Sequence, residues 1–150
     1  MANIYLAVGT VTCTASAVAR SCADLLRNAG HDVTVDEQAS VAALNAAQAD
    51  AVLIVTATTG KGDIPNNLLN FYVELETESP LQNGRPFGVI SLGDSSYSMT
   101  FCQAGALMEE RFLGLQGAQP IPRITIDAIE TQIPDDDALF WLKEWMEALF

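Results

Sequence analysis

The sequence predicts an α/β fold: a five-stranded parallel sheet with helices on both faces. Short apolar runs alternate along the chain with segments of helical periodicity, the pattern of repeated β/α units. The strongest of these runs are continuously apolar, as in strands that are covered on both faces. The chain has 150 residues and neither an internal repeat nor a linker, so we expect one domain over residues 1–150.

The first part of the chain contains two predicted strands and two predicted helices. Residues 4–8 are continuously apolar and predict a buried strand. Residues 15–29 follow with helical periodicity, and Gly30 is a typical residue just beyond a helix end. Residues 32–36 predict a weaker strand, and residues 41–47 a short helix. The apolar stripe expected on the first helix consists of Val18, Cys22, Leu25 and Ala29.

The middle of the chain carries the strongest strand signal. Residues 51–56 include four consecutive aliphatic side chains, and residues 87–92 form a second buried run. Residues 66–76 and residues 101–115 have helical periodicity. These segments continue the alternation of strand and helix.

The last two elements are an edge strand and a long helix. Residues 121–126 alternate between polar and apolar side chains, as expected at the edge of a sheet. Residues 134–150 begin with a proline and three aspartates, which favour a helix start. Trp141 and Trp145 are expected to pack rather than to contact a ligand. The stripe expected to face the core consists of Leu139, Leu142, Met146 and Leu149.

The charge balance is strongly acidic, with 7 Lys and Arg against 19 Asp and Glu and a net charge of −12. Nucleic acids and anionic membranes bind clustered cations, so the balance argues against both. Either a partner with a basic face or simple solubility accounts for the acidic surface. No apolar stretch has the length of a membrane span, and the N-terminus has no basic segment typical of a signal peptide. The three cysteines lack zinc-site spacing, and we expect a cytoplasmic protein without a metal.

Ligands of such sheets bind beyond the carboxyl ends of the strands, so three loops form the candidate site. Residues 9–15, Gly-Thr-Val-Thr-Cys-Thr-Ala, bring hydroxyls and backbone amides to a helix start, which favours an anion. The loop has neither a P-loop lysine nor a GxGxxG motif, so a monophosphate fits better than a triphosphate or dinucleotide. Capping of the helix by Thr12 or Thr14 is the competing interpretation.

The other two loops suit a flat ligand. Residues 56–66 place two glycines around Lys61, which permits a sharp turn and a close approach. Residues 91–102 place Tyr97 in a polar segment, where its ring can stack on another ring. The competing interpretation of residues 56–66 is an ordinary turn between strand and helix. The competing interpretation of Tyr97 is that its ring packs back on the fold.

The motif TATTGKGDIPNN, followed by LGDSSY and FC, resembles the flavodoxins, small proteins that bind FMN. The resemblance covers essentially the whole chain. It is greatest to short flavodoxins of the MioC type and to the FMN domains of diflavin reductases. It implies a flavodoxin-like three-layer sandwich with strand order 2-1-3-4-5.

The resemblance also implies which residues bind FMN. The phosphate is held by the first loop, Thr10, Val11, Thr12, Cys13, Thr14 and Ala15. One face and the N5 edge of the isoalloxazine ring are bordered by Thr58, Thr59, Gly60, Lys61 and Gly62. Tyr97 stacks on the other face. The pocket is completed by Gly93, Asp94, Phe101 and Cys102.

The chain departs from the family pattern at several of these positions. Cys13 replaces a glycine that is usual in the phosphate loop, and Thr59 replaces a residue that is often aromatic. Lys61 stands where an acid is common, so we expect it to favour the negatively charged, fully reduced flavin. One extra residue separates Tyr97 from Phe101.

By this resemblance, the chain is an electron-transfer protein without catalytic residues of its own. Its expected partners have basic faces, such as an NADPH-dependent flavodoxin reductase and an acceptor enzyme, and the expected state is a monomer. The alternative is an NAD(P)H-dependent quinone or flavin reductase, against which the net charge of −12 argues. A phosphoryl receiver is set aside, because the third strand ends in Thr56 and Ala57 rather than an acceptor aspartate.

Overall fold

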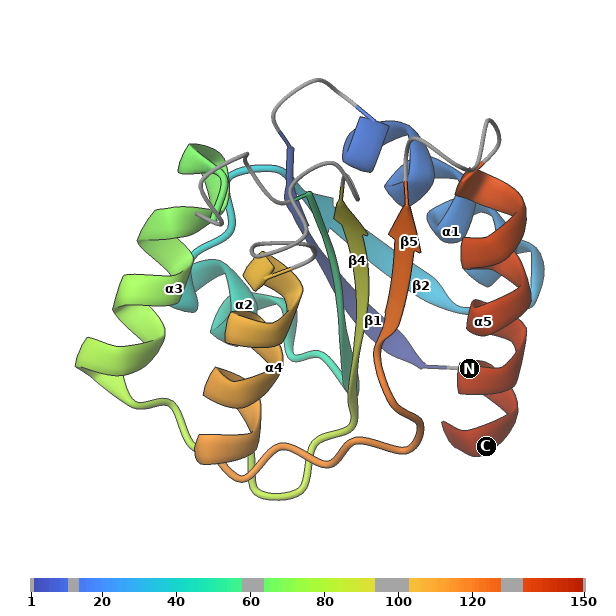
Figure 1. Cartoon of the computed structure of the whole chain (residues 1–150). Helices are drawn as coiled ribbons and strands as arrows, with labels where there is room; N and C mark the ends of the chain where they lie inside the picture. The colour runs from blue at the N-terminus through green and yellow to red at the C-terminus, as the bar shows by residue number, and fades with distance from the viewer. Residues whose placement is uncertain (1, 11–13, 58–63, 94–102, 128–133, 150) are drawn as a thin grey trace.

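The computed structural model describes residues 2–10, 14–57, 64–93, 103–127 and 134–149. Its five strands form one parallel sheet in the predicted order β2-β1-β3-β4-β5 (Figure 1). In chain order the elements are β1 (Asn3–Gly9), α1 (Thr14–Asn28), β2 (Asp32–Asp36), α2 (Val41–Ala47), β3 (Ala51–Ala57), α3 (Asn66–Glu78), β4 (Phe87–Gly93), α4 (Gln103–Gly114), β5 (Ile124–Asp127) and α5 (Pro134–Leu149).

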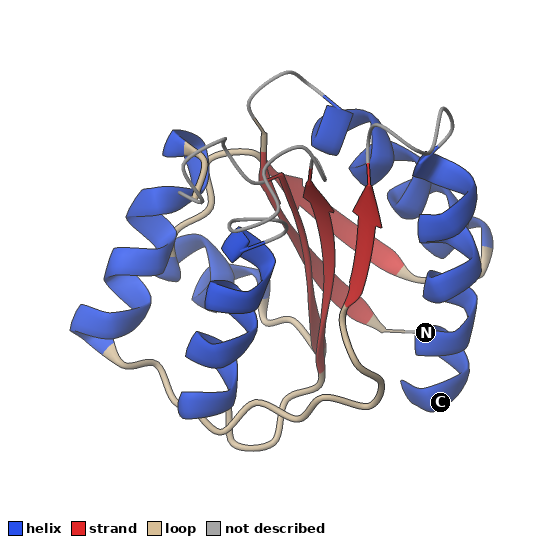
Figure 2. Cartoon of the chain, in the orientation of Figure 1, coloured by secondary structure: helices blue, strands red, loops and turns tan. Residues whose placement is uncertain are grey.

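The molecule has three layers, with α1 and α5 on one face of the sheet and α2, α3 and α4 on the other (Figure 2). Successive side chains of a strand point to opposite faces, so each central strand feeds both cores. In β1, Leu6 packs towards α1 and α5, whereas Tyr5 and Ala7 pack towards the other three helices. Burial on both faces explains why this strand is almost continuously apolar.

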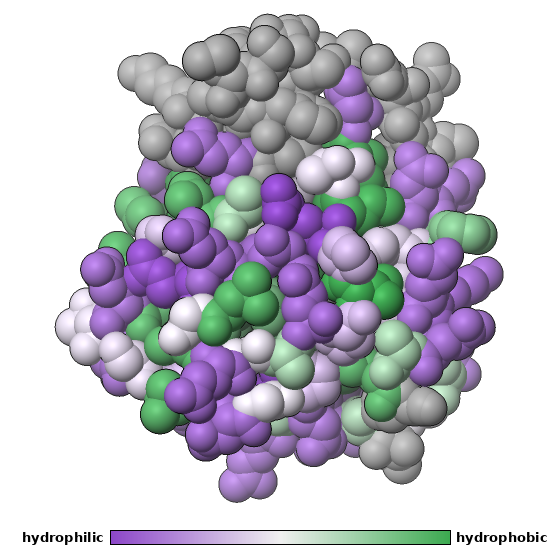
Figure 3. Space-filling view, turned by 60° about the horizontal axis from the view of Figure 1, so that its bottom comes forward, coloured by the Kyte–Doolittle hydropathy of each residue, from purple (hydrophilic) through white to green (hydrophobic). Residues whose placement is uncertain are grey.

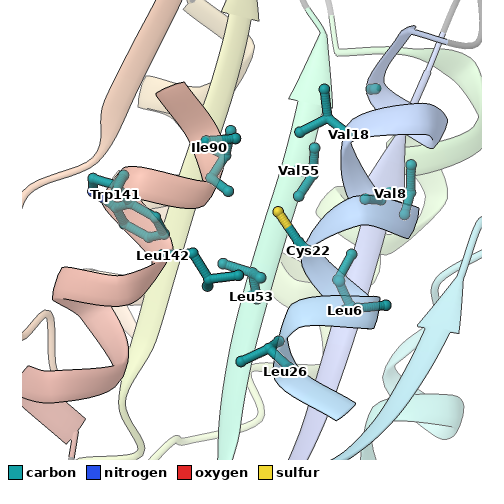
Figure 4. Close-up of a cluster of buried hydrophobic side chains, with 14 of the residues drawn as sticks. Leu6, Val8, Val18, Cys22, Leu26, Leu53, Val55, Ile90, Trp141 and Leu142 are labelled. Carbon is teal, nitrogen blue, oxygen red and sulfur yellow. The ribbon is translucent and has the colours of Figure 1, made fainter. Parts of the chain in front are cut away.

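Figure 4 shows the core between the sheet and the α1–α5 layer. Val18, Cys22 and Leu26 of α1 meet the aliphatic side chains of β1 and β3. The stripe predicted for α1 is therefore correct at its first two positions and wrong at the last. Leu26 is fully buried, while Ala29 lies beyond the helix and is exposed.

The buried face of α5 also differs from the predicted stripe. It is centred on the two tryptophans, whose rings stack with centroids 6.0 Å apart. Their indole N–H groups donate to the carbonyls of Pro122 (2.9 Å) and Phe87 (3.3 Å). Packing by Trp141 and Trp145 is thus confirmed. The buried face of the helix is therefore shifted around its axis from the predicted one. Three of the four residues predicted to face the core are only partly buried: Leu139, Met146 and Leu149.

Two element ends have clear local causes. Gly30 has φ +95°, and the N–H groups of Gly30 and His31 donate to Arg27 and Leu26, which closes α1 with a Schellman motif. The last strand begins at Ile124, not at the predicted residue 121. Proline has no N–H for a ladder, and the carbonyl of Pro122 is used by Trp141.

Gly88 in β4 permits the close approach of α5. A Cβ at this position would lie 2.6 Å from Cη2 of Trp141 and 2.7 Å from Nε1 of Trp145. We predict that Gly88→Ala lowers the free energy of unfolding by about 1–3 kcal/mol, because rings and backbone must shift. Gly114→Ala is the control, since a Cβ there meets nothing within 4 Å. Urea titration of both variants tests this, and equal stabilities would contradict it.

Candidate functional site

The carboxyl ends of three strands lie side by side in the sheet. Gly9 of β1 pairs with Thr56 of β3, Ala57 of β3 pairs with Leu92 of β4, and β4 ends at Gly93. The chain passes from β1 to β2 on one side and then to β3 on the other, so β1 and β3 flank the point where the strand order reverses. Ligands of doubly wound sheets bind at this point. The predicted position of the site is therefore consistent with the fold.

Four of the predicted site residues lie within the described part of the chain: Thr10, Thr14, Ala15 and Gly93. The others lie outside the described residues: Val11, Thr12, Cys13, Thr58, Thr59, Gly60, Lys61, Gly62, Asp94, Tyr97, Phe101 and Cys102. Their roles remain predictions. The first two residues of the helix predicted at 101–115 are also outside, and α4 is described from Gln103.

Thr10 directly follows β1 and holds a polar atom that suits a ligand. Its backbone N–H donates to Oδ1 of Asn67 at 2.9 Å. Its hydroxyl oxygen is buried and has no hydrogen-bond partner among the residues that the structure describes. A buried hydroxyl without a partner is costly, and an anion at the loop would supply an acceptor for it. This observation fits the phosphate group that the resemblance implies.

The other described site residues frame the same edge. Thr14 begins α1, so the N-terminus of this helix and its partial positive charge face the loop. The side chain of Ala15 is fully buried in the α1–α5 core, which leaves its backbone as the group available to a ligand. Gly93 ends β4, is buried, and pairs with Asp127 of β5.

Asn67 is a residue at this edge that the sequence reasoning missed. It lies in the first turn of α3, and its side-chain N–H groups donate to the carbonyls of Val8 (2.8 Å) and Glu37 (2.9 Å). Its side-chain oxygen accepts the N–H of Thr10. The one signal in the sequence was a pair of asparagines, Asn66 and Asn67, at the start of a predicted helix. Its partners lie 30 to 59 residues away along the chain, so periodicity did not reveal them.

The turn after β2 brings a second missed residue, Glu37, to the same place. Its carboxylate accepts a hydrogen bond from the hydroxyl of Ser16, which is buried in the first turn of α1. Asp36 fixes this turn, since its carboxylate accepts from the Tyr5 hydroxyl at 2.8 Å and from the Gln38 N–H at 2.9 Å. Burial, and then the bond to Asp36, raise the pKa of Tyr5 well above its ordinary value. Tyr5 therefore stays protonated and keeps donating.

The one histidine of the chain lies away from this edge. His31 precedes β2, at the opposite end of the sheet, where its Nδ1 accepts from the N–H of Ala2 at 3.1 Å. Among the described residues, no cluster of three potential metal ligands is found. No helix in the described ranges is long and apolar enough to span a membrane.

Known proteins resemble this chain over nearly its whole length. The family model of the flavodoxins matches residues 6–141. Protein MioC of Escherichia coli O157:H7 is 32% identical over 149 residues, which cover 99% of each chain. The sulfite reductase (NADPH) flavoprotein alpha-component of Bacillus subtilis (strain 168) is 31% identical, over 98% of this chain and 24% of that protein. The solved structure of a mutant flavodoxin from Pseudomonas aeruginosa has a TM-score of 0.93 at 39% identity, covering 98% of both chains.

The buried hydroxyl of Thr10, which no described residue partners, can be tested by substitution. Thr10→Val keeps the shape of the side chain and removes the buried oxygen, so the apoprotein should be as stable as the parent or more stable. The affinity for FMN should fall about tenfold or more, the value of one hydrogen bond to a charged group. Fluorescence titration with FMN and urea unfolding of the apoprotein measure the two effects. Thr34→Val, an exposed change on β2, is the control, and an unchanged FMN affinity in Thr10→Val would contradict the role.

Proposed function

This chain belongs to the flavodoxin family, and on that premise we propose that it holds FMN across the carboxyl ends of β1, β3 and β4. It is an FMN-binding electron-transfer protein, a carrier rather than an enzyme. Residues 1–150 would constitute one FMN-binding domain. The observation that supports this position best is the buried hydroxyl of Thr10 at the switch point of the sheet, which no described residue partners.

FMN, when bound, supplies the redox chemistry, and the protein positions it and adjusts its potential. Thr10 and the backbone at the start of α1 would hold the phosphate with neutral donors and the helix dipole. From the sequence, Lys61 and its neighbouring glycines would border the ring, and Tyr97 would stack on it. No proton-transfer residue of the chain is needed for this function.

The charge distribution supports partners with basic faces. Asp127 ends β5, and exposed Asp136 and Asp137 lie in the first turn of α5, so acids flank the edge where the strands end. Among the described residues, two arginines already pair with acids: Arg111 with Glu76 and Arg123 with Glu109. We propose that a basic NADPH-dependent flavodoxin reductase and a basic acceptor enzyme dock in turn at this edge.

The surface supports a monomer, although it exposes several large apolar side chains. Leu69 and Val73, one turn apart on α3, expose 42% and 49% of their area, and Phe140 on α5 exposes 69%. Figure 3 shows apolar residues separated by hydrophilic ones on the face in view, so they do not merge into one broad patch. We also propose a cytoplasmic location, which the odd number of cysteines and the buried Cys22 support.

Lys61 is one of two lysines and lies in the loop that would border the ring. We predict that Lys61→Glu lowers the potential at which bound FMN takes its second electron by roughly tens of millivolts, because a negative charge disfavours the anionic reduced flavin. Lys143→Glu makes the same charge change at an exposed position of α5 and should have a smaller effect. Redox titration compares them; an unchanged or raised potential for Lys61→Glu would refute the role.

The carrier and reductase functions differ in one measurement. The FMN-loaded protein should not oxidise NADH or NADPH in the steady state with a quinone or free flavin as acceptor, since its acidic edge opposes anionic nucleotides. Adding an NADPH-dependent flavodoxin reductase should allow its reduction. Direct turnover at rates typical of enzymes would instead favour the quinone or flavin reductase.

A further inference from the structure

We propose that Asn67 is the positioning residue of the phosphate-binding loop, residues 10–15, and that it makes the protein prefer FMN to flavins without a phosphate. The inference rests on the proposed function, because it assumes that this loop meets the phosphate. Asn67 is not expected to touch the ligand itself. Its effect would come from the hydrogen bonds that connect Thr10, where the loop begins, with Ser16, just beyond its end.

The amide of Asn67 is nearly saturated by the backbone of other segments. Both of its N–H groups have carbonyl acceptors, Val8 at 2.8 Å and Glu37 at 2.9 Å, and its oxygen accepts the Thr10 N–H at 2.9 Å. The carbonyls of Val8 and Glu37 can only accept, so the NH₂ group of Asn67 must face them. The N–H of Thr10 can only donate, so the side-chain oxygen must face it, and together these partners define the orientation of the amide. The side chain does not cap its own helix, which starts after Pro65 without a side-chain cap.

These bonds join both ends of the phosphate-binding loop. Thr10 at the start of the loop is bonded to Asn67, and Asn67 is bonded to the carbonyl of Glu37. The Glu37 carboxylate is bonded to Ser16, in the first turn of α1 just beyond the loop. We call the chain of contacts through Thr10, Asn67, Glu37 and Ser16 the loop clasp. It spans the loop from its entry to its exit.

The clasp determines what Thr10 presents to a ligand. The backbone N–H of Thr10 is engaged by Asn67, and its buried hydroxyl has no partner within the described ranges. Groups that are held in position before the ligand arrives lose less entropy on binding, and Thr10 at the loop's start is held in this way. Riboflavin has no phosphate and gains little from this arrangement, whereas FMN gains its full benefit. The ratio of the two affinities therefore reports on the clasp.

The experiment measures dissociation constants of FMN and riboflavin for the apoprotein by flavin fluorescence. Asn67→Ala removes all three bonds. Asn67→Asp keeps the side-chain shape and the acceptor for Thr10, loses both donors, and adds a negative charge. Asn66, the exposed neighbour at the start of α3, supplies matched controls in Asn66→Ala and Asn66→Asp. Urea unfolding of each apoprotein records changes in global stability.

We expect both Asn67 variants to reduce the preference for FMN over riboflavin about tenfold, with little change in riboflavin affinity. The Asn66 variants should retain the parental ratio. A variant that is less stable but keeps the parental ratio would show a purely structural role and overturn the inference. Should Asn67→Ala not fold, the isosteric Asn67→Asp decides by the same ratio. Failure of the parent protein to bind FMN would instead refute the proposed function.

Discussion

The close approach of α3 to the end of β1 is the contact on which the carboxyl edge of the sheet depends. A Cβ on Gly9 would lie 2.6 Å from Oγ1 of Thr56 and 2.8 Å from Cδ2 of Leu68, so only glycine lets the helix sit this near. With Leu68 packed there, Asn67 reaches the carbonyl of Val8 near the end of β1 and the first amide beyond the strand, that of Thr10. An apolar contact thus brings together segments that are far apart in the sequence, and polar bonds then fix their geometry.

The fold could be predicted from the sequence because its central strands are covered on both faces. Burial on two sides leaves a continuous apolar run, so the strands around Leu6, Leu53 and Val89 were located to within two residues. Helix faces were less predictable. On α5 the large indoles of Trp141 and Trp145 take the interior positions, and neighbouring aliphatic side chains move to the margin.

The candidate site was predictable only in its location. Strand order and the chemistry of the loops predict where an anionic, flat ligand would bind, and Thr10 is a predicted site residue on this ground. Asn67 and Glu37 were not identified, since a hydrogen bond between segments 57 residues apart leaves no periodic signal in either one. Such contacts depend on how elements pack, and a single sequence does not display that packing.

The stacked indoles of α5 have a consequence for observing the molecule. They are both of the tryptophans in the chain, and both lie in the core between α5 and the sheet. Their intrinsic fluorescence should therefore report on whether α5 is packed against the sheet. Flavin absorbance reports on a separate property, whether the protein has bound a flavin. Folding and loading thus carry separate optical signatures, and an empty protein can be distinguished from an unfolded one in a single cuvette.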